Sequence, residues 1–441
     1  MKHTRQELKE WQALPLGVKI LMTQERIRNW VREYGEEGTC ISFSGGKDST
    51  VLLDIVRNRM GYKDIPAVFV DTGLEYPEIR DFVKSFDNVI ILKPSLTFKE
   101  VIQKYGYPFI SKEVSECVYG ARKYLRKFID GQTIPYQYWY ERVTGTGRYQ
   151  KKEIIPDVDQ AALFEMTRGG TITNGENFVD YRSIAEAIMR GGKNISLTRE
   201  HKTFSDGDEK DPYTLNARAA MLMGVYTTNW DQKKKGIIPD SRDRSIFSQE
   251  KYKFFLDAPF NISAECCKVM KKKPIHKFNH ESGRHPMTAQ MAEESRIRTQ
   301  KWLQNGCNGF NLKEPISNPM AFWTEQDVLH YIKENNIQIC SVYGEIVAEE
   351  KDQICGQMSL ADYNLVEDER RLKTTGCKRT GCMFCGYGCH LEKPGEGRFE
   401  LMKETHPKQY DYIMRPKEEG GLDYKNIIDW INEHGNLNIR Y

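Results

Sequence analysis

The sequence lacks an excess of charge of either sign. Its 441 residues include 65 Lys and Arg against 62 Asp and Glu, which gives a formal net charge of +3 at pH 7. This near balance excludes a global electrostatic field able to hold nucleic acid, although it allows a local basic patch. Hydrophobic residues make up 39% of the chain, which suffices for a packed core and excludes wholesale disorder.

Long apolar runs are also missing. No run approaches the roughly 18 residues needed to cross a bilayer, and residues 1–11 are charged where a signal peptide would need an apolar stretch. We therefore expect a cytoplasmic protein without membrane contact. Thiols stay reduced in that compartment, so the 11 cysteines are expected to be core residues, metal ligands or reactive thiols.

Strand-like segments alternate with helical patterns near the start of the chain. Residues 39–43, 67–70 and 88–92 are short and apolar, and the apolar residues between them recur at helical spacing. This alternation predicts parallel βαβ units and therefore the α/β fold class, with a Rossmann-like parallel sheet flanked by helices. Ligands of such sheets bind beyond the carboxyl ends of the strands, where residues 44–49 and 71–73 fall.

A glycine loop, Ser44-Gly-Gly-Lys-Asp-Ser49, joins the first strand to an amphipathic helix. Gly45 and Gly46 permit positive φ and close approach, the helix adds its positive N-terminal end, and Lys47 adds a full charge. These features predict a phosphate site. An ordinary strand-to-helix turn with Asp48 as cap would explain the same residues without a ligand. The spacing is neither the Walker type nor Gly-x-Gly-x-x-Gly.

The loop resembles the Ser-Gly-Gly-x-Asp-Ser signature of the PP-loop ATP pyrophosphatases. Residues 70–78, Val-Asp-Thr-Gly-Leu-Glu-Tyr-Pro-Glu, are similar to the second nucleotide motif of the phosphoadenosine phosphosulfate (PAPS) reductase branch. The resemblance covers roughly 20–117 and 255–412. It implies an adenine nucleotide alpha hydrolase-like fold and cleavage of ATP between its α and β phosphates.

The resemblance also implies the residues of the site. Lys47 and Asp48 are the expected catalytic pair, and Mg²⁺ is expected beside the leaving pyrophosphate. Residues 291–298 look like the Arg-rich phosphate motif of the reductases, but the leading arginines are absent and only Ser295 and Arg298 align. The expected ATP-binding residues are Ser44, Gly45, Gly46, Lys47, Asp48, Ser49, Asp71, Thr72, Gly73 and Arg298.

Composition and resemblance together divide the chain into five parts. Gly and charged residues increase between about 140 and 249, a stretch that the resemblance leaves uncovered. The parts are N-terminal helices (1–38), the PP-loop nucleotide-binding core (39–139), an inserted subdomain (140–250), the second part of the PAPS reductase-like domain (251–376) and a Cys-rich C-terminal region (377–441).

Four cysteines have a spacing suited to an iron–sulfur cluster. Cys266 and Cys267 are adjacent, and Cys382-Met-Phe-Cys385 follows far downstream. Four thiolates are what a [4Fe–4S] cluster needs, and this order resembles the cluster-binding adenylylsulfate reductases and the DNA-phosphorothioation sulfurtransferases. Thiols that are simply buried are one alternative. A zinc site is the other, although it leaves the adjacent pair unexplained. Its ligands would be Cys377, Cys382, Cys385 and Cys389, with His390 beside them. The remaining cysteines are expected in the core: Cys40, Cys117, Cys307, Cys340 and Cys355.

Two departures from the reductases bear on the reaction. The chain keeps the whole loop, which a substrate without a β,γ-diphosphate would not need, and residues 435–441 carry no thiol. We therefore expect an ATP-dependent sulfurtransferase that adenylates an acceptor oxygen, releases pyrophosphate and lets sulfur displace AMP. Expected partners are ATP, a sulfur donor such as a cysteine desulfurase, and a nucleic acid acceptor, which the basic segment 122–127 favours. A homodimer is compatible with the sequence.

Two alternative functions stay open. The first is a phosphoadenylyl-sulfate or adenylyl-sulfate reductase in which an internal cysteine replaces the missing tail thiol. The second is a non-catalytic nucleotide-binding component of a modification or defence complex, with the inserted subdomain as its docking surface.

Overall fold

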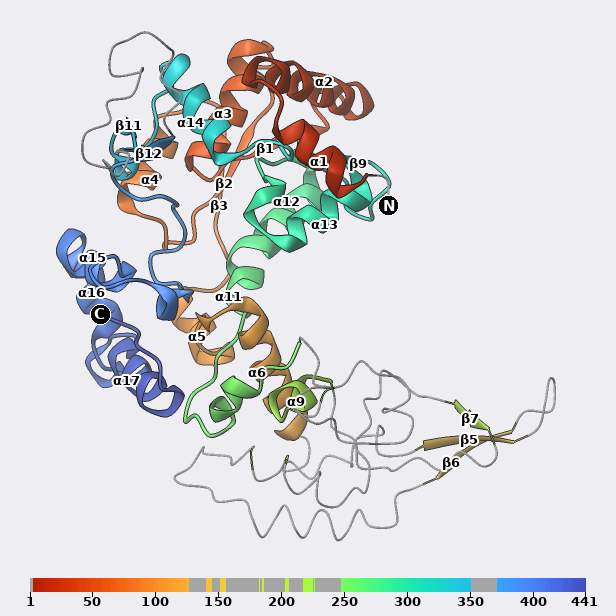
Figure 1. Ribbon diagram of the computed structural model, residues 1–441, viewed down its shortest axis with the longest axis vertical. Helices are drawn as coiled ribbons and strands as arrows, with labels where there is room; N and C mark the ends of the chain where they lie inside the picture. The colour runs from red at the N-terminus through yellow and green to blue at the C-terminus, as the bar shows by residue number, and fades with distance from the viewer. Residues whose placement is uncertain are drawn as a thin grey trace, which may run out of the picture. The chain divides into compact units, whose positions relative to one another are not determined.

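The computed structural model describes residues 3–126, 140–144, 151–155, 182, 185, 203–205, 217–224, 226, 247–349 and 371–441. The chain forms two compact units (elements labelled in Figure 1). Unit 1 comprises Met1–Phe98 and Cys267–Met383, and unit 2 comprises Lys99–Cys266 and Phe384–Tyr441. Most of the inserted subdomain expected at 140–250 lies outside the described residues, as does Cys355.

Unit 1 is built on a six-stranded sheet with the order β3-β2-β1-β8-β10-β9. The strands are β1 (Thr39–Ser42), β2 (Ala67–Val70), β3 (Val89–Leu92), β8 (His285–Met287), β9 (Asn308–Gly309) and β10 (Ile316–Ser317). Neighbours run parallel, except that β9 is antiparallel to β10. The α/β fold class and the three strands expected near the start of the chain are confirmed. Because β1 has β2 on one side and β8 on the other, the sheet offers a ligand crevice at the end of β1.

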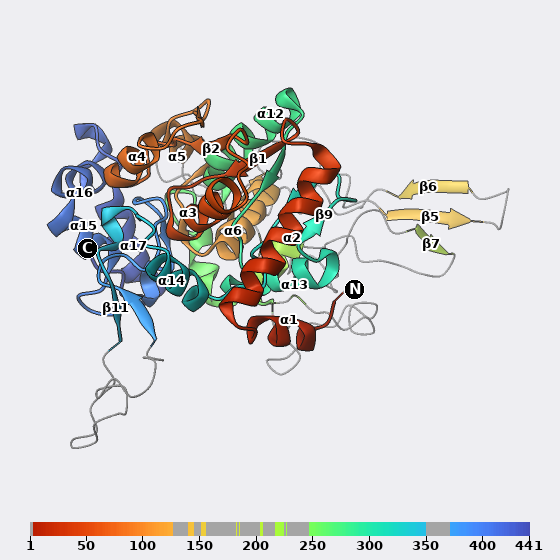
Figure 2. The ribbon, with the colours of Figure 1, turned by 90° about the horizontal axis from the view of Figure 1, so that it is seen from above.

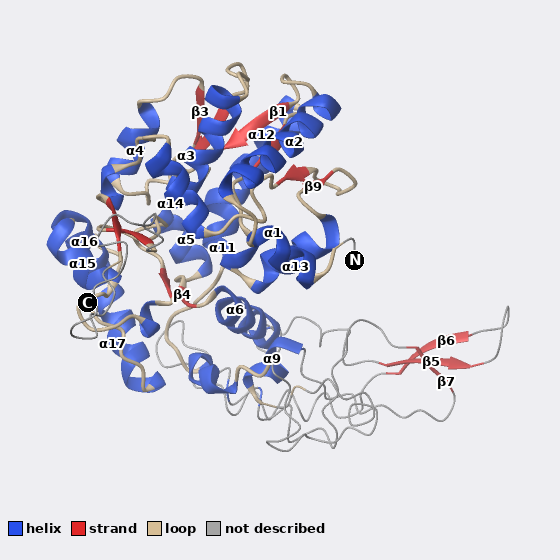
Figure 3. Cartoon of the chain, turned by 45° about the horizontal axis from the view of Figure 1, so that its top comes forward, coloured by secondary structure: helices blue, strands red, loops and turns tan. Residues whose placement is uncertain are grey.

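Helices flank this sheet, and Figure 3 shows the strands in red among blue helices. The long ones are α1 (Arg5–Gln12), α2 (Leu16–Tyr34), α3 (Lys47–Asp54), α4 (Pro77–Lys84), α12 (Lys273–Ser282), α13 (Arg296–Asn305) and α14 (Glu325–Glu334). Helix α2 buries Ile20, Ile27 and Trp30, which recur at helical spacing, and it packs against β1 and β10 (Figure 2). Short turns η1 (Ile55–Arg59), η5 (Lys268–Lys272), η6 (Ala292–Glu294) and η7 (Ser341–Tyr343) and the antiparallel pair β11 (Ile346–Ala348) and β12 (Leu372–Thr374) complete the unit.

Helix α14 begins with a capping box. The Thr324 side chain accepts the backbone N–H of Asp327, and the Asp327 carboxylate accepts the backbone N–H of Thr324. Asp327 also pairs with the buried ammonium of Lys19, at 2.7 Å. This fixes the first turn of α14, which carries Glu325, against α2.

Unit 2 is mainly helical. Its elements are α5 (Phe98–Tyr105), β4 (Phe109–Ile110), α6 (Lys112–Arg126), β5 (Tyr140–Thr144), β6 (Lys151–Ile155), β7 (Thr203–Ser205), α9 (Ala217–Leu222), η4 (Glu250–Leu256), β13 (Gly386–Tyr387), η9 (Cys389–Leu391), α15 (Arg398–Thr405), α16 (Pro407–Met414), η10 (Lys417–Glu419) and α17 (Tyr424–Gly435). The short α11 (Glu265–Cys267) spans the point where the chain passes to unit 1. Across the described ranges, no helix is both long and apolar enough to cross a membrane.

Candidate nucleotide-binding site

The glycine loop curls directly from the end of β1 into α3. Gly45 has φ +70°, and a Cβ there would lie 2.8 Å from Val83 and 2.9 Å from Ile79, so only glycine fits. Inside the loop, the Ser49 hydroxyl accepts the N–H of Ser44 at 3.2 Å. Helix α3 has no side-chain cap hydrogen bond, so Asp48 does not cap it. The turn capped by Asp48 is therefore not what this segment forms.

Lys47 is almost fully enclosed, with 3% of its side chain exposed. Its ammonium lies 3.2 Å from a carboxylate oxygen of Glu325 and donates to the main-chain carbonyl of Lys378 at 3.1 Å. Its backbone N–H donates to the hydroxyl of Tyr343 at 3.2 Å. The two donor groups that a phosphate would use are thus held by protein oxygens.

Tyr343 forms the buried support of the loop. Its hydroxyl is hydrogen-bonded to Oγ1 of Thr380 at 2.7 Å, and only 2% of the residue is exposed. Burial raises the pKa of Tyr343 to about 12, so it stays protonated near neutral pH. Sequence reasoning missed Tyr343, Lys378 and Thr380, because these residues carry no motif and meet Lys47 only through the fold.

Asp48 lies in a field of opposing charges. Burial raises the pKa of its carboxyl, Lys47 lowers it, Glu325 raises it, and Arg379 and Arg298 lower it. The structure therefore places Arg298 in the electrostatic environment of the loop, although α13 is far from the loop in sequence. Arg298 also forms an ion pair with Glu294.

The turn after β2 is held by its own side chains. Asp71 pairs with Arg80 at 2.9 Å and accepts the N–H of Gly73 at 3.1 Å. The Thr72 hydroxyl donates to Glu75 at 2.8 Å. Since β1 and β2 are parallel neighbours, this turn and the glycine loop lie at the same edge of the sheet.

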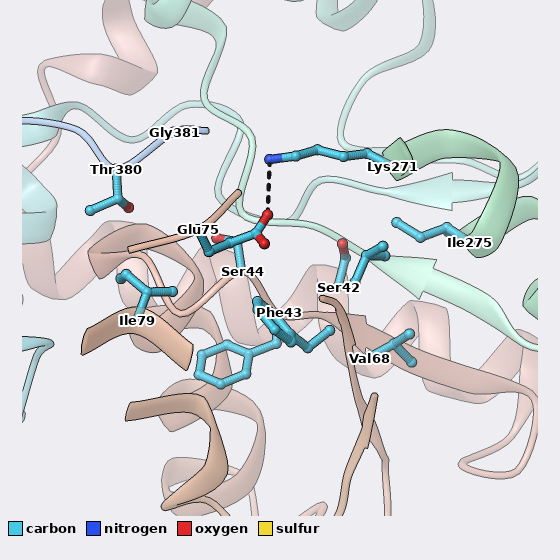
Figure 4. Close-up of a pocket in the computed structure, with 12 residues that line it drawn as sticks. Ser42, Phe43, Ser44, Val68, Glu75, Ile79, Lys271, Ile275, Thr380 and Gly381 are labelled. Carbon is cyan, nitrogen blue, oxygen red and sulfur yellow. Dashed lines mark ion pairs between the residues drawn. The ribbon is translucent and has the colours of Figure 1, made fainter. Parts of the chain in front are cut away.

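A cavity of about 150 Å³ lies at this edge. Figure 4 shows Ser44, Glu75, Lys271 and Thr380 around it, with the ammonium of Lys271 pointing to Glu75 at 3.7 Å. Apolar side chains complete the lining: Phe43, Val68, Phe69, Val70, Ile79 and Ile275. Apolar walls with a few converging polar groups are typical of a small-molecule site.

Comparison with known proteins agrees with this architecture. The sequence profile of the phosphoadenosine phosphosulfate reductase domain matches residues 38–127 and 233–387. The chain belongs to this family. The matched residues include the glycine loop, the turn after β2, Arg298 and the four cysteines expected to bind a cluster.

Individual curated proteins are similar to this chain over shorter segments than the family profile. An uncharacterized protein of Methanocaldococcus jannaschii is 35% identical over 113 residues, which cover 23% of this chain and 26% of that protein. An adenosine 5'-phosphosulfate reductase of Bacillus velezensis is 31% identical over 94 residues, covering 20% of this chain and 40% of the reductase. The matches thus span less than half of these relatives.

In unit 1 of this PAPS reductase family protein, two of the expected cluster cysteines face Lys271. Burial lowers the pKa of Lys271, but Cys382, through charge and a hydrogen bond, raises it, as do Glu75 and Cys267, and the net direction is upward. Lys271 therefore remains a cation beside two sulfur atoms and the cavity. Its proximity to Cys382 could not be seen in the sequence.

In unit 2 the other two cysteines share the surroundings of a buried tyrosine. Burial raises the pKa of Tyr424, and Cys385, Cys266 and Cys389 raise it further. Cys389 donates its thiol hydrogen to the carbonyl of Gly386 at 2.8 Å, and burial raises its pKa to about 12. No group of three or more His, Cys, Asp or Glu side chains in the described part of the chain is arranged to hold a metal ion. The expected core cysteines Cys40, Cys117, Cys307 and Cys340 are buried, as predicted.

Within the basic segment 122–127, which was expected to favour a nucleic acid, Arg122 has a structural role. Arg122 is 7% exposed and donates to the main-chain carbonyls of Phe260 and Ala258, the latter at 3.0 Å. Lys123 is exposed, and Lys127 lies outside the described residues. Arg122 thus stabilises unit 2 and is not offered to a phosphate backbone.

Proposed function

We propose that this PAPS reductase family protein is an ATP-dependent sulfurtransferase. The observation that carries the proposal is the intact glycine loop with its enclosed Lys47. The charges of Arg298 and Arg379 act on Asp48 of the same loop. Several cations around one phosphate loop suit a triphosphate better than the phosphate–sulfate anhydride of an adenylyl sulfate.

In this proposal the loop residues act on the leaving group. Phosphate oxygens would replace Glu325 and the Lys378 carbonyl as acceptors for the Lys47 ammonium, and the exchange keeps the cation satisfied. The loop amides would then stabilise the charge that develops on pyrophosphate as the acceptor is adenylated. Mg²⁺ would enter as the counter-ion of the ATP phosphates.

We also propose that Cys266, Cys267, Cys382 and Cys385 hold a [4Fe–4S] cluster. Four thiols are the donor set such a cluster requires, and the cluster would supply sulfur-transfer chemistry. Lys271 supports the proposal, because its cation faces Cys267 and Cys382 and would offset thiolate charge. The zinc alternative, which takes Cys377 and Cys389 together with Cys382 and Cys385, leaves the adjacent pair Cys266 and Cys267 without a role.

The other partners are proposed from the family resemblance. A cysteine desulfurase would supply sulfur, and a nucleic acid would accept it, although buried Arg122 gives that acceptor no support.

The test uses full-length protein purified without oxygen. Calorimetric titration should show that the protein binds ATP. In an assay with ATP, a sulfur donor and RNA or DNA, the protein should release pyrophosphate. Protein that binds no ATP and releases no pyrophosphate with any acceptor would contradict the proposal.

A sulfonucleotide reductase is the second candidate. The match to an adenosine 5'-phosphosulfate reductase favours it. Thioredoxin-dependent release of sulfite from adenosine 5'-phosphosulfate, without pyrophosphate release from ATP, would establish this activity in place of the first.

A further inference from the structure

The segment Lys378–Thr380 runs along the glycine loop. The Lys378 carbonyl accepts from the Lys47 ammonium, and Oγ1 of Thr380 binds the hydroxyl of Tyr343, which in turn holds the Lys47 backbone N–H. A Cβ on Gly46 would lie 3.4 Å from the same Thr380 oxygen. Both neighbours of Arg379 are therefore anchored at the loop, which fixes the backbone of Arg379 beside it.

Arg379 differs from the two other cations at the loop in its ion pairing. Lys47 is paired with Glu325 and Arg298 with Glu294, whereas Arg379, an exposed residue, forms no ion pair with any carboxylate of the described segments. Arg379 faces the carboxylates of Asp48 and Glu293 only at longer range.

Arg298 and Arg379 also repel each other. Burial lowers the pKa of Arg298, the charge of Arg379 lowers it further, and the carboxylate of Asp48 raises it. Two like charges near one another are unfavourable unless anions offset them. The carboxylate of Asp48 interacts with both guanidinium groups, and a bound phosphate would add a second anion beside them. The fold imposes this proximity from two distant parts of the chain, α13 and the segment before Cys382.

We propose that Arg379 is a phosphate ligand that, with Lys47 and Arg298, binds the pyrophosphate portion of a nucleoside triphosphate. The inference rests on the proposed function and names one further binding residue for it. A planar guanidinium can hold two phosphate oxygens at once, which suits a chain of phosphates. Because AMP lacks the β and γ phosphates, Arg379 should distinguish ATP from AMP.

The experiment measures dissociation constants by calorimetry for ATP, inorganic pyrophosphate and AMP on the full-length protein. Arg379→Gln should weaken ATP and pyrophosphate roughly 10- to 100-fold and leave AMP within about twofold. Arg379→Lys should recover part of the loss, because it restores charge without the planar fork. Lys373→Gln, at an exposed position on β12 of the same segment, is the control and should bind like the wild type.

Each outcome decides the inference. Equal ATP affinity in wild type and Arg379→Gln would overturn it while leaving the proposed function intact. An equal loss for AMP and ATP would also overturn it, because the residue would then act on the nucleoside or on the fold. Wild-type protein without affinity for ATP would contradict the proposed function and, with it, the assignment of Arg379.

Discussion

The ammonium of Lys47 lies 3.2 Å from a carboxylate oxygen of Glu325, the first residue of α14. The cation of the glycine loop, in the first segment of unit 1, is thus paired with an acid from the second segment. The capping box of Thr324 and the Lys19–Asp327 pair hold that acid in place. Any phosphate that binds Lys47 must therefore compete with Glu325.

Replacing this carboxylate should strengthen nucleotide binding. Glu325→Gln keeps the shape and removes the competing charge, so we expect ATP to bind several-fold more tightly, on the order of 1 kcal/mol. Calorimetric titration measures the change. Glu334→Gln, exposed at the end of α14, is the control. Weaker ATP binding in Glu325→Gln would mean that Glu325 assists the ligand and does not compete with it.

Removing the loop cation should have the opposite effect. Lys47→Met deletes the ammonium but keeps an unbranched side chain in the enclosed position, and ATP affinity should fall at least about tenfold. Lys63→Met, at an exposed position, should change nothing. The same titration checks both variants, and an unchanged affinity in Lys47→Met would remove Lys47 from the proposed site.

Asp48 should make stability depend on pH. Burial raises its pKa above the ordinary value of 3.8, so the folded protein keeps the proton over a range where the unfolded chain has lost it. The free energy of unfolding therefore falls as pH rises from the pKa of the unfolded state to that of the folded state. Above the folded-state pKa, the ionised buried carboxylate destabilises the protein by its full amount. Asp48→Asn removes this cost.

The measurement is thermal melting of wild type and Asp48→Asn between about pH 3 and pH 7. The variant should gain stability relative to wild type as pH rises and show little difference at the acid end. A difference that stays constant across the range would show that the carboxyl is not perturbed as described.

Arg122 should matter for stability and not for ligand binding. Arg122→Met leaves the buried carbonyls of Ala258 and Phe260 without their donors, at a cost of about 3 kcal/mol. Lys123→Met, its exposed neighbour, should be nearly neutral. Denaturant titration compares them. If Arg122→Met were as stable as the wild type and bound nucleic acid more weakly, residues 122–127 would instead contact nucleic acid.

The cysteine variants separate the cluster from zinc. Cys266→Ser and Cys382→Ser should lose bound iron and visible absorbance, because each removes one of four proposed ligands. Cys389→Ser should keep both, and the buried Cys340→Ser serves as a second control. Metal analysis of protein purified without oxygen gives the answer. If the wild type contained zinc and no iron, and if Cys389→Ser lost that zinc, the proposal of an iron–sulfur cluster would be wrong.

Local patterns in the sequence predicted the features that depend on neighbours along the chain. Apolar segments gave β1, β2 and β3, the glycines gave a loop whose Gly45 has positive φ, and the apolar surroundings of Cys40 and Cys340 gave buried thiols. Segment 122–127 shows the limit of this reasoning. The sequence shows that Arg122 is basic, but it does not show that the side chain donates to the main-chain carbonyl of Ala258 inside unit 2.

The sequence by itself therefore determined the fold class, the glycine loop and the candidate cysteines, because strand period, glycine conformation and motif spacing act over a few residues. Only the tertiary structure decided that Glu325 and Tyr343 contact Lys47 and that Arg379 lies in the electrostatic environment of Asp48. Parallel strands must be joined by long crossovers, so the loops at one sheet edge come from distant segments whose meeting no local pattern records.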